Sequence, residues 1–275
     1  EGWRDCGVPV LTLCDTDEAR ATALAARLQV PQIHTSAAAI LSATDRVVVG
    51  IGLLPMPLRN VAITAMEIAT LERMFPGRLR VAVGHGVQPW MEQVGAKARS
   101  PLGLAREYLV ALRRLLAGEE VTVDGNYVTL DAVRLGWPPL TRVPVLLGAI
   151  GPKSLALAGE CADGVLLDAD FTVDGAREAV AACLAARRAS GIDVPFETAA
   201  YQRFYRGPDA QDELARETRP GGLDAALSGS ATEVAERVHA MALAGVETLV
   251  LMPSSTEADP ADYLRFAATE VAPLV

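Results

Sequence analysis

The sequence predicts an α/β protein with the (β/α)8 TIM-type barrel fold, as a single domain over residues 1–275. Short apolar runs alternate with longer helical patterns, and this alternation indicates a parallel sheet whose faces are covered by helices. A length of 275 residues is typical of one such barrel. Hydrophobic residues make up 51% of the chain and charged residues 21%, which indicates a large core and argues against a disordered chain.

The clearest βαβ unit covers residues 46–86. The apolar run 47–49 is typical of a strand that is buried on both faces, as in a parallel sheet. Two prolines then hold the chain extended before a helical pattern over residues 58–74, which ends ahead of Gly77. A second strand follows over residues 79–84. Both strands end in glycines, and glycines at the carboxyl end of a sheet leave room for a flat ligand.

The other predicted elements continue the alternation of strand and helix. The predicted strands cover residues 8–13, 46–52, 79–84, 143–148, 164–168, 198–204 and 248–252. The predicted helices cover residues 16–28, 58–74, 101–116, 152–161, 173–189 and 232–244. These are seven of the eight strands of a barrel, and residues 1–3 already read as the end of a helix. We therefore expect the first βα unit to be missing or truncated, either in this sequence or in the protein itself.

Two stretches depart from this alternation of strand and helix. Residues 120–139 alternate with period two around Asp124-Gly125-Asn126, which predicts a β-hairpin inserted near residues 119–139. Residues 206–227 are polar and acidic, which predicts a mobile loop. The sequence contains no internal repeat or low-complexity tract.

The charge and the cysteines narrow the class of protein. The net charge of −9 argues against nucleic acid and anionic membranes as partners. No apolar run approaches the roughly 20 residues that span a bilayer. The four cysteines, Cys6, Cys14, Cys161 and Cys183, have no metal-binding spacing, so we expect no metal site and buried thiols at Cys14 and Cys161. These features predict a protein of the reducing cytoplasm with a small molecule as its partner.

Chemistry in a barrel of this kind takes place at the carboxyl ends of the strands. In this chain those ends are apolar and rich in glycine, with few nucleophiles. Such a lining fits a cofactor that brings its own reactivity while the protein supplies the shape of the site. Hydrolysis fits badly, because the chain has no G-x-S-x-G motif, no H-E-x-x-H motif and no Cys/His pair.

The loop Gly148-Ala149-Ile150-Gly151 joins a predicted strand to a helix that begins near Pro152. We expect free backbone N–H groups there, and these suit a phosphate together with the positive end of the helix dipole. Lys153 follows in the first helical turn and is one of two lysines in the chain. It either contacts the phosphate or faces solvent.

Three segments, in order, resemble the bacterial luciferase-like family of flavin- and F420 (deazaflavin)-dependent oxidoreductases. They are GIGLLPMPLRN with the helix and strand that follow it to residue 86, residues 144–168 and residues 228–253. The resemblance covers most of the chain from about Gly7 onward. It implies a (β/α)8 barrel that binds FMN or coenzyme F420, performs monooxygenation or hydride transfer on a small organic substrate, and forms a homodimer.

The resemblance also assigns residues to the cofactor. The family carries a non-prolyl cis peptide behind the flavin-type ring, which we expect between Gly52 and Leu53. Gly151 matches the position that meets the cofactor phosphate. The implied cofactor-binding set is Asp15, Gly52, Leu53, Gly84, Gly148, Ala149, Ile150, Gly151, Lys153 and Asp168.

His85 is the candidate catalytic residue. It stands between two glycines at the end of a predicted strand. An imidazole there would point into the barrel mouth, where it could donate to a flavin carbonyl or act as an acid or base near neutral pH. The alternative is a spacer residue that faces solvent.

Some positions depart from the deazaflavin branch of the family. Asp15 is followed by Thr16 where that branch often has histidine, and Val87 and Trp90 stand where it often has glutamate and asparagine. These departures argue against a sugar-phosphate dehydrogenase and leave the choice between FMN and F420 open. Two other functions stay open as well: a non-catalytic flavin-binding barrel, and a cofactor-free lyase or aldolase with Lys153 as its Schiff-base residue.

Overall fold

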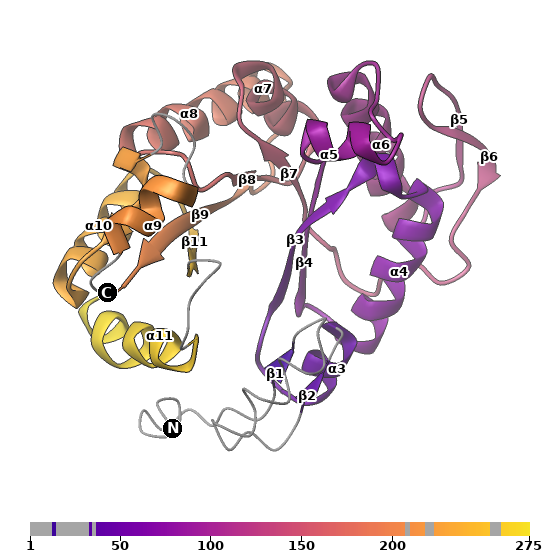
Figure 1. The fold of residues 1–275 in the computed structure, drawn as a ribbon. Helices are drawn as coiled ribbons and strands as arrows, with labels where there is room; N and C mark the ends of the chain where they lie inside the picture. Colours follow the sequence, from indigo (N-terminus) through magenta and orange to yellow (C-terminus); the bar gives the residue numbers. More distant parts are fainter. Residues whose placement is uncertain (1–12, 15–32, 35–36, 207–209, 218–222, 254–259) are drawn as a thin grey trace. The chain divides into compact units, whose positions relative to one another are not determined.

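The computed structural model describes residues 13–14, 33–34, 37–206, 210–217, 223–253 and 260–275 (Figure 1). The chain divides into two compact units. Unit 1 comprises residues 1–45, 167–178 and 199–275, and unit 2 comprises residues 46–166 and 179–198. The single domain predicted over residues 1–275 stays a prediction.

Unit 2 is built on parallel strands. Their order in the sheet is β3 (Val49–Pro55), β4 (Leu79–Gly84), β7 (Val145–Ala149) and β8 (Gly164–Leu167). Ile51 lies opposite Val81, and Val81 lies opposite Val145, in parallel register. Val81 and Val83 of β4 and Val145 of β7 are fully buried, which explains why these two strands are apolar runs in the sequence.

Helices connect these strands. They are α4 (Val61–Met74), α5 (Gln88–Gln93), α6 (Pro101–Leu116) and α7 (Pro152–Cys161), with a short 3-10 helix η1 (Met56–Leu58) ahead of α4. The side-chain oxygens of Asn60 and Ser100 cap α4 and α6. Between these two helices the buried Tyr108 hydroxyl donates to Thr64 Oγ1 over 2.7 Å. Helix α8 (Val173–Ala189) has residues in both units.

The predicted β-hairpin follows α6. Its strands β5 (Val121–Asp124) and β6 (Thr129–Val133) pair antiparallel. The Glu107 carboxylate of α6 accepts hydrogen bonds from the three amides of residues 126–128, at 3.2, 2.7 and 3.0 Å. Burial raises the pKa of Glu107, but these hydrogen bonds outweigh burial and hold the pKa below its ordinary value. The turn of the hairpin is therefore anchored to α6.

Unit 1 contains further parallel strands. β9 (Glu197–Tyr205), which belongs to this unit from Ala199 onward, pairs with β10 (Leu227–Ser228) and β11 (Thr248–Met252). β1 (Leu13–Cys14) pairs with β2 (Ile33–His34). The helices are α3 (Ala37–Ser42), α9 (Ala210–Glu217), α10 (Ala231–Leu243) and α11 (Pro260–Phe266), with short helical turns η2 (Leu223–Ala225), η3 (Ala267–Val271) and η4 (Ala272–Leu274). Phe204 packs with Tyr263 and Phe266 at ring-centroid distances of 5.7 and 5.5 Å, which forms an aromatic core.

Most predicted elements are present at the expected residues. Helices α6, α7 and α8 have the predicted bounds. Strand β3 begins at Val49 rather than Arg46 and continues to Pro55, where it pairs with Gly84. The prediction that the run 47–49 is buried on both faces is wrong, because Val47 and Val48 are 47% and 50% exposed. The predicted strand 8–13 and helix 16–28 lie outside the described residues, apart from the last residue of the strand.

The prediction of a loop over residues 206–227 is wrong, because α9 and the start of β10 lie within it. Ala210 and Leu214 are spaced by four residues and pack beside Tyr205. These two residues are the apolar face of α9. The other residues of the helix are mostly polar or charged, so the sequence shows no clear helical pattern there. None of the described helices is long and apolar enough to cross a membrane.

Candidate functional site

The predicted cis peptide bond between Gly52 and Leu53 is present. It coincides with a shift in the register of β3 against β4, between Ile51 and Leu54. Here the Leu53 side chain lies over the ends of two neighbouring strands. A Cβ atom added at Gly84 would be 2.7 Å from Leu53 Cδ2, and one added at Gly148 would be 2.4 Å from the same atom. Both positions therefore have to be glycine for Leu53 to lie as it does.

His85 follows Gly84 and is half-buried. Its Nδ1 atom lies 3.1 Å from the Gly86 carbonyl oxygen, so a neutral ring that carries its proton on Nδ1 donates to this oxygen. Gln88 Nε2 donates to the carbonyl oxygens of His85 and Gly86, at 3.1 and 3.3 Å. Sequence reasoning missed Gln88, which holds the turn that carries the imidazole.

The loop Gly148–Gly151 leads from β7 into α7, as predicted, but two of its amides are not free. The hydroxyl of Ser154 accepts from the N–H groups of Ile150 and Gly151, at 3.3 and 3.1 Å, and donates to the Gly151 carbonyl at 2.8 Å. The expectation of free N–H groups is therefore wrong for these two residues. Ser154 is buried and was missed; its hydroxyl accepts from the amide of Gly151, the N-cap residue, as the third residue of a capping box does.

Lys153 stands on the exposed side of the same loop. Its side chain is exposed, and Ile150 beside it is 47% exposed. Neither the amide nor the ammonium group of Lys153 has a hydrogen-bond or ion-pair partner among the described residues. An anion at this loop would therefore meet one free amide and one free cation, both from Lys153. Ala149 is buried and is part of the hydrophobic core.

The two acidic residues of the predicted set belong to unit 1. Asp168 follows β8, and its Oδ1 atom accepts from the Ala169 amide at 2.8 Å. Burial, and then the negative charge of Asp168, raises the pKa of Tyr201. Asp15 lies outside the described residues. Among the residues that are described, no group of three or more His, Cys, Asp or Glu side chains could hold a metal ion.

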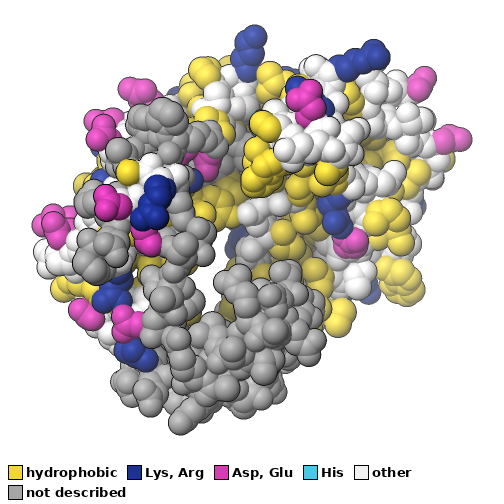
Figure 2. All heavy atoms as spheres, in the orientation of Figure 1, with side chains coloured by type: hydrophobic (Ala, Val, Ile, Leu, Met, Phe, Trp, Pro, Cys, Tyr) yellow, Lys and Arg dark blue, Asp and Glu magenta, His cyan; other side chains and the backbone are white. Residues whose placement is uncertain are grey.

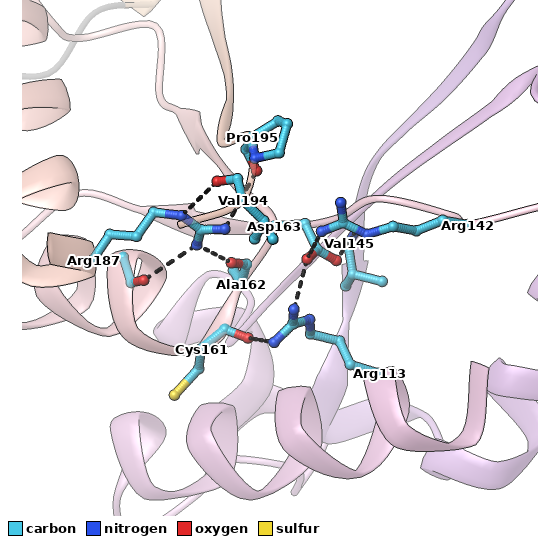
Figure 3. Close-up of polar contacts among 10 residues, drawn as sticks. Arg113, Arg142, Val145, Cys161, Ala162, Asp163, Arg187, Val194 and Pro195 are labelled. Carbon is cyan, nitrogen blue, oxygen red and sulfur yellow. Dashed lines mark hydrogen bonds and ion pairs between the residues drawn. The ribbon is translucent and has the colours of Figure 1, made fainter. Parts of the chain in front are cut away.

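A dense polar cluster lies at the other end of the unit 2 strands, where β7 and β8 begin (Figure 3). One oxygen of the buried Asp163 carboxylate accepts from Arg113 at 2.8 Å and from Arg142 at 2.6 Å. The other oxygen accepts from the Val145 amide at 3.1 Å. The amino-terminal ends of barrel strands serve stability rather than chemistry, so we assign a structural role to this cluster.

Arg187 lies beside this cluster and is 3% exposed. Its guanidinium group donates to the carbonyl oxygens of Ala162, Val194 and Pro195, at 3.0, 3.1 and 3.3 Å (Figure 3). Burial lowers the pKa of this guanidinium group, and the charge of Asp163 partly offsets the effect. Arg187 therefore ties the segment after α8 to the turn between α7 and β8.

Comparisons of the sequence and of the fold with known proteins identify the family of this chain. Residues 20–219 match the model of the luciferase-like monooxygenase family. A 5,10-methylenetetrahydromethanopterin reductase from Methanolobus tindarius is 34% identical over 182 residues, which cover 65% of this chain and 54% of that protein. The chain thus spans about half the length of this relative.

Two solved structures share the fold at 20% sequence identity each. The coenzyme F420 dependent tetrahydromethanopterin reductase from Methanopyrus kandleri has a TM-score of 0.72, over 99% of this chain and 92% of that chain. An F420-dependent secondary alcohol dehydrogenase, solved with an F420-acetone adduct, has a TM-score of 0.74, over 97% of this chain and 98% of that chain. This likeness confirms the predicted α/β barrel class. By its match over residues 20–219, the chain belongs to the luciferase-like monooxygenase family.

Proposed function

We propose that this chain is the barrel of an oxidoreductase that binds coenzyme F420, with FMN as the alternative cofactor, and acts on a small organic substrate. The observation that carries the proposal is the packing of Leu53 over Gly84 and Gly148, at the carboxyl ends of three neighbouring parallel strands. F420 is placed first because an F420-dependent glucose-6-phosphate dehydrogenase from Nakamurella multipartita is 33% identical to this chain over 137 residues.

The residues at these strand ends fit a flat ring. Because positions 84 and 148 have no Cβ, Leu53 can lie across both strands and form an apolar wall, with Gly52 exposed beside it. A bound deazaflavin or flavin supplies hydride chemistry, and FMN can also activate oxygen. The protein's part is to hold the ring against Leu53 and to exclude water there.

His85 would hold or move the proton in this reaction. Its Nδ1 atom faces the Gly86 carbonyl, so Nε2 is the atom that remains for a ligand. In the neutral ring Nε2 accepts a proton or a hydrogen bond, and in the imidazolium form it donates one. Gln88 keeps the imidazole in place through its bonds to the turn.

The cofactor phosphate would lie at the exposed side of the Ile150–Lys153 turn. The free amide and the ammonium group of Lys153 support this placement, while Ser154 occupies the amides of Ile150 and Gly151. Asp15 and Asp168 are further cofactor contacts that we propose from the family resemblance alone.

Titration of the chain with F420 and, separately, with FMN tests this function. We expect micromolar binding of F420, followed by its fluorescence and by calorimetry. Leu53→Ala should weaken binding by roughly tenfold or more, because it removes the apolar wall. Gly50→Ala is the matched control, because a Cβ at that position meets no atom within 4 Å. Binding of FMN instead of F420 would move the protein to the flavin branch, and binding of neither would overturn the proposal.

We also propose that the protein is a homodimer that associates through α4. Ile63, Met66 and Met74 lie on one face of this helix and are 52%, 55% and 57% exposed. Figure 2 shows hydrophobic side chains gathered at the surface over the region of α4. Such a patch is typical of a protein interface. Light scattering should give a dimer for the parent chain and a monomer for Met66→Glu.

A cytoplasmic location is a further proposal. The described cysteines Cys161 and Cys183 are buried free thiols, and burial raises the pKa of both, that of Cys183 to about 12. Unpaired thiols of this kind are typical of a reducing compartment. Fractionation of cells that express the native gene, with the protein followed by antibody, tests the location.

A further inference from the structure

A cleft of about 610 Å³ lies within unit 2, among η1, the start of α4, residues 95–99, α6 and the turn of the hairpin. Its volume is in the range of about 300–1,000 Å³ that is typical of small-molecule sites. None of the residues that we propose for the cofactor lines this cleft. It is therefore a separate feature of the unit.

Part of the floor of the cleft is apolar and well packed. It is formed by side chains that are at most 6% exposed, namely Met56, Val61, Leu104, Tyr108 and Val128. Tyr108 is held in place by its hydrogen bond to Thr64. A rigid floor that includes an aromatic ring can bury the apolar body of a ligand without rearrangement.

The rim of the cleft is positively charged. Arg59, Lys97 and Arg99 line it, and no aspartate or glutamate is among the lining residues. This is unusual in a chain with 34 acidic and 25 basic residues. Lys97 is one of only two lysines in the chain.

The three cationic side chains of the rim differ in the ion pairs and hydrogen bonds that they already make. Arg59 pairs with Glu67, and its Nε donates to Thr64 Oγ1. Lys97 pairs with Glu92 at 2.9 Å, but the two side chains are 46% and 67% exposed, and pairs of this kind are weak. Arg99 is exposed and has no carboxylate partner among the described residues.

The carboxylate of α6 that lies beside the hairpin turn is already hydrogen-bonded. Glu107 accepts three backbone amides from residues 126–128, so its negative charge is directed at the turn. Tyr127 lines the cleft, and its hydroxyl oxygen accepts from the Ser100 amide at 2.6 Å, which leaves the hydroxyl proton for another acceptor. The cleft therefore offers donors and cations above an apolar floor.

We propose that this cleft is a second ligand site, which binds a small organic anion. The apolar body of the ligand packs on the floor near Tyr108, and its carboxylate or phosphate group lies against Arg99 and Lys97. The proposal goes beyond the oxidoreductase function, because it uses none of the residues that we assign to the cofactor.

Calorimetry with phenyl phosphate, benzoate and benzyl alcohol tests the proposal. These probes share an aromatic ring and differ in the group that it carries. We expect at least one of the two anions to bind, and benzyl alcohol to bind roughly tenfold or more weakly than that anion. The stronger anion identifies the acid group that the cleft prefers. Equal binding of the neutral probe, or no binding of either anion at millimolar concentration, would overturn the proposal.

Variants of the rim locate the binding. Arg99→Gln and Lys97→Gln should each weaken the anion by about fivefold or more. Arg188→Gln is the matched control, since Arg188 is an exposed arginine of α8 that does not line the cleft. If the rim variants bind the anion as tightly as this control does, the site is elsewhere and the proposal fails. F420 binding is measured on the same variants and should not change, so the two proposals fail independently.

Discussion

The side chain of Leu53 lies so close to Gly148 that a Cβ at position 148 would be 2.4 Å from Leu53 Cδ2. Gly148→Ala therefore forces Leu53 to move. We expect this variant to lose about 1 kcal/mol of the free energy of unfolding, at the low end for overpacking, because the atom that must move is the end of a half-buried leucine side chain. Urea unfolding measures the loss.

Gly151→Ala is the control for this effect. A Cβ at position 151 meets no atom within 4 Å, and the residue has a φ of −90°, which alanine adopts freely. Its free energy of unfolding should stay within about 0.5 kcal/mol of the parent value. Equal losses in the two variants would show that Leu53 is not packed against Gly148.

Ser154 determines the stability of the turn into α7. Ser154→Ala removes the acceptor of two amides and the donor to the Gly151 carbonyl. We expect a loss of about 1–2 kcal/mol in urea unfolding. Thr70→Ala is the control, because the Thr70 hydroxyl is exposed and bonds only within α4. A Ser154→Ala variant as stable as Thr70→Ala would contradict this role.

The strand ends of unit 2 could be predicted from the sequence because apolar runs and glycines mark them. The loop at Gly148–Gly151 and the bounds of α6 and α7 follow from the same local rules. The cis peptide is different. No local rule distinguishes Gly52-Leu53 from an ordinary turn, so only the family resemblance predicts it.

The hydrogen-bond partners of the site could not be predicted in the same way. Gln88 reaches the carbonyl oxygen of His85 because Gly86 has a φ of +71°, which turns the chain back on itself. The sequence shows a glycine there but not the direction of the turn. Helix α9 was missed for a similar reason, since Ala210 and Leu214 are identified as apolar contacts only by their packing beside Tyr205.

Glu72 makes the stability of unit 2 sensitive to acid. It is 1% exposed, and its carboxylate accepts from the Leu140 amide at 2.7 Å and from the amide and hydroxyl of Thr141. Burial by itself raises the pKa of Glu72, but the hydrogen bonds outweigh burial and hold the pKa below its ordinary value. The resulting stabilisation is complete above the unfolded-state pKa of about 4.3 and is lost as the pH falls through the lower folded-state pKa.

Glu72→Gln tests this linkage. At neutral pH the variant should be less stable than the parent by about 1–3 kcal/mol, because the new amide N–H₂ group faces backbone donors. The difference should shrink as the pH falls below about 4.3, since the carboxylate of the unfolded parent is protonated first and that of the folded parent at lower pH. Glu120→Gln, at an exposed position, should leave the pH dependence unchanged. A Glu72→Gln difference that is the same at acidic and neutral pH would contradict the prediction.

The arginine cluster at the start of β7 and β8 depends on Asp163 more than on either arginine. Asp163 is 3% exposed, so Asp163→Asn leaves Arg113 and Arg142 without their carboxylate, and we expect a loss of about 3 kcal/mol or more in urea unfolding. The Arg142 side chain is 52% exposed, so Arg142→Gln should cost less than about 1 kcal/mol.

Salt separates the two effects. In about 0.5 M sodium chloride the exposed Arg142 charge is screened, and the cost of Arg142→Gln should approach zero. The cost of Asp163→Asn should persist, because the Asp163 carboxylate is buried and salt screens a buried charge much less than an exposed one. If Arg142→Gln destabilises the protein as much as Asp163→Asn does, the stabilisation depends on the arginine at the surface, and the buried carboxylate is not the centre of the cluster.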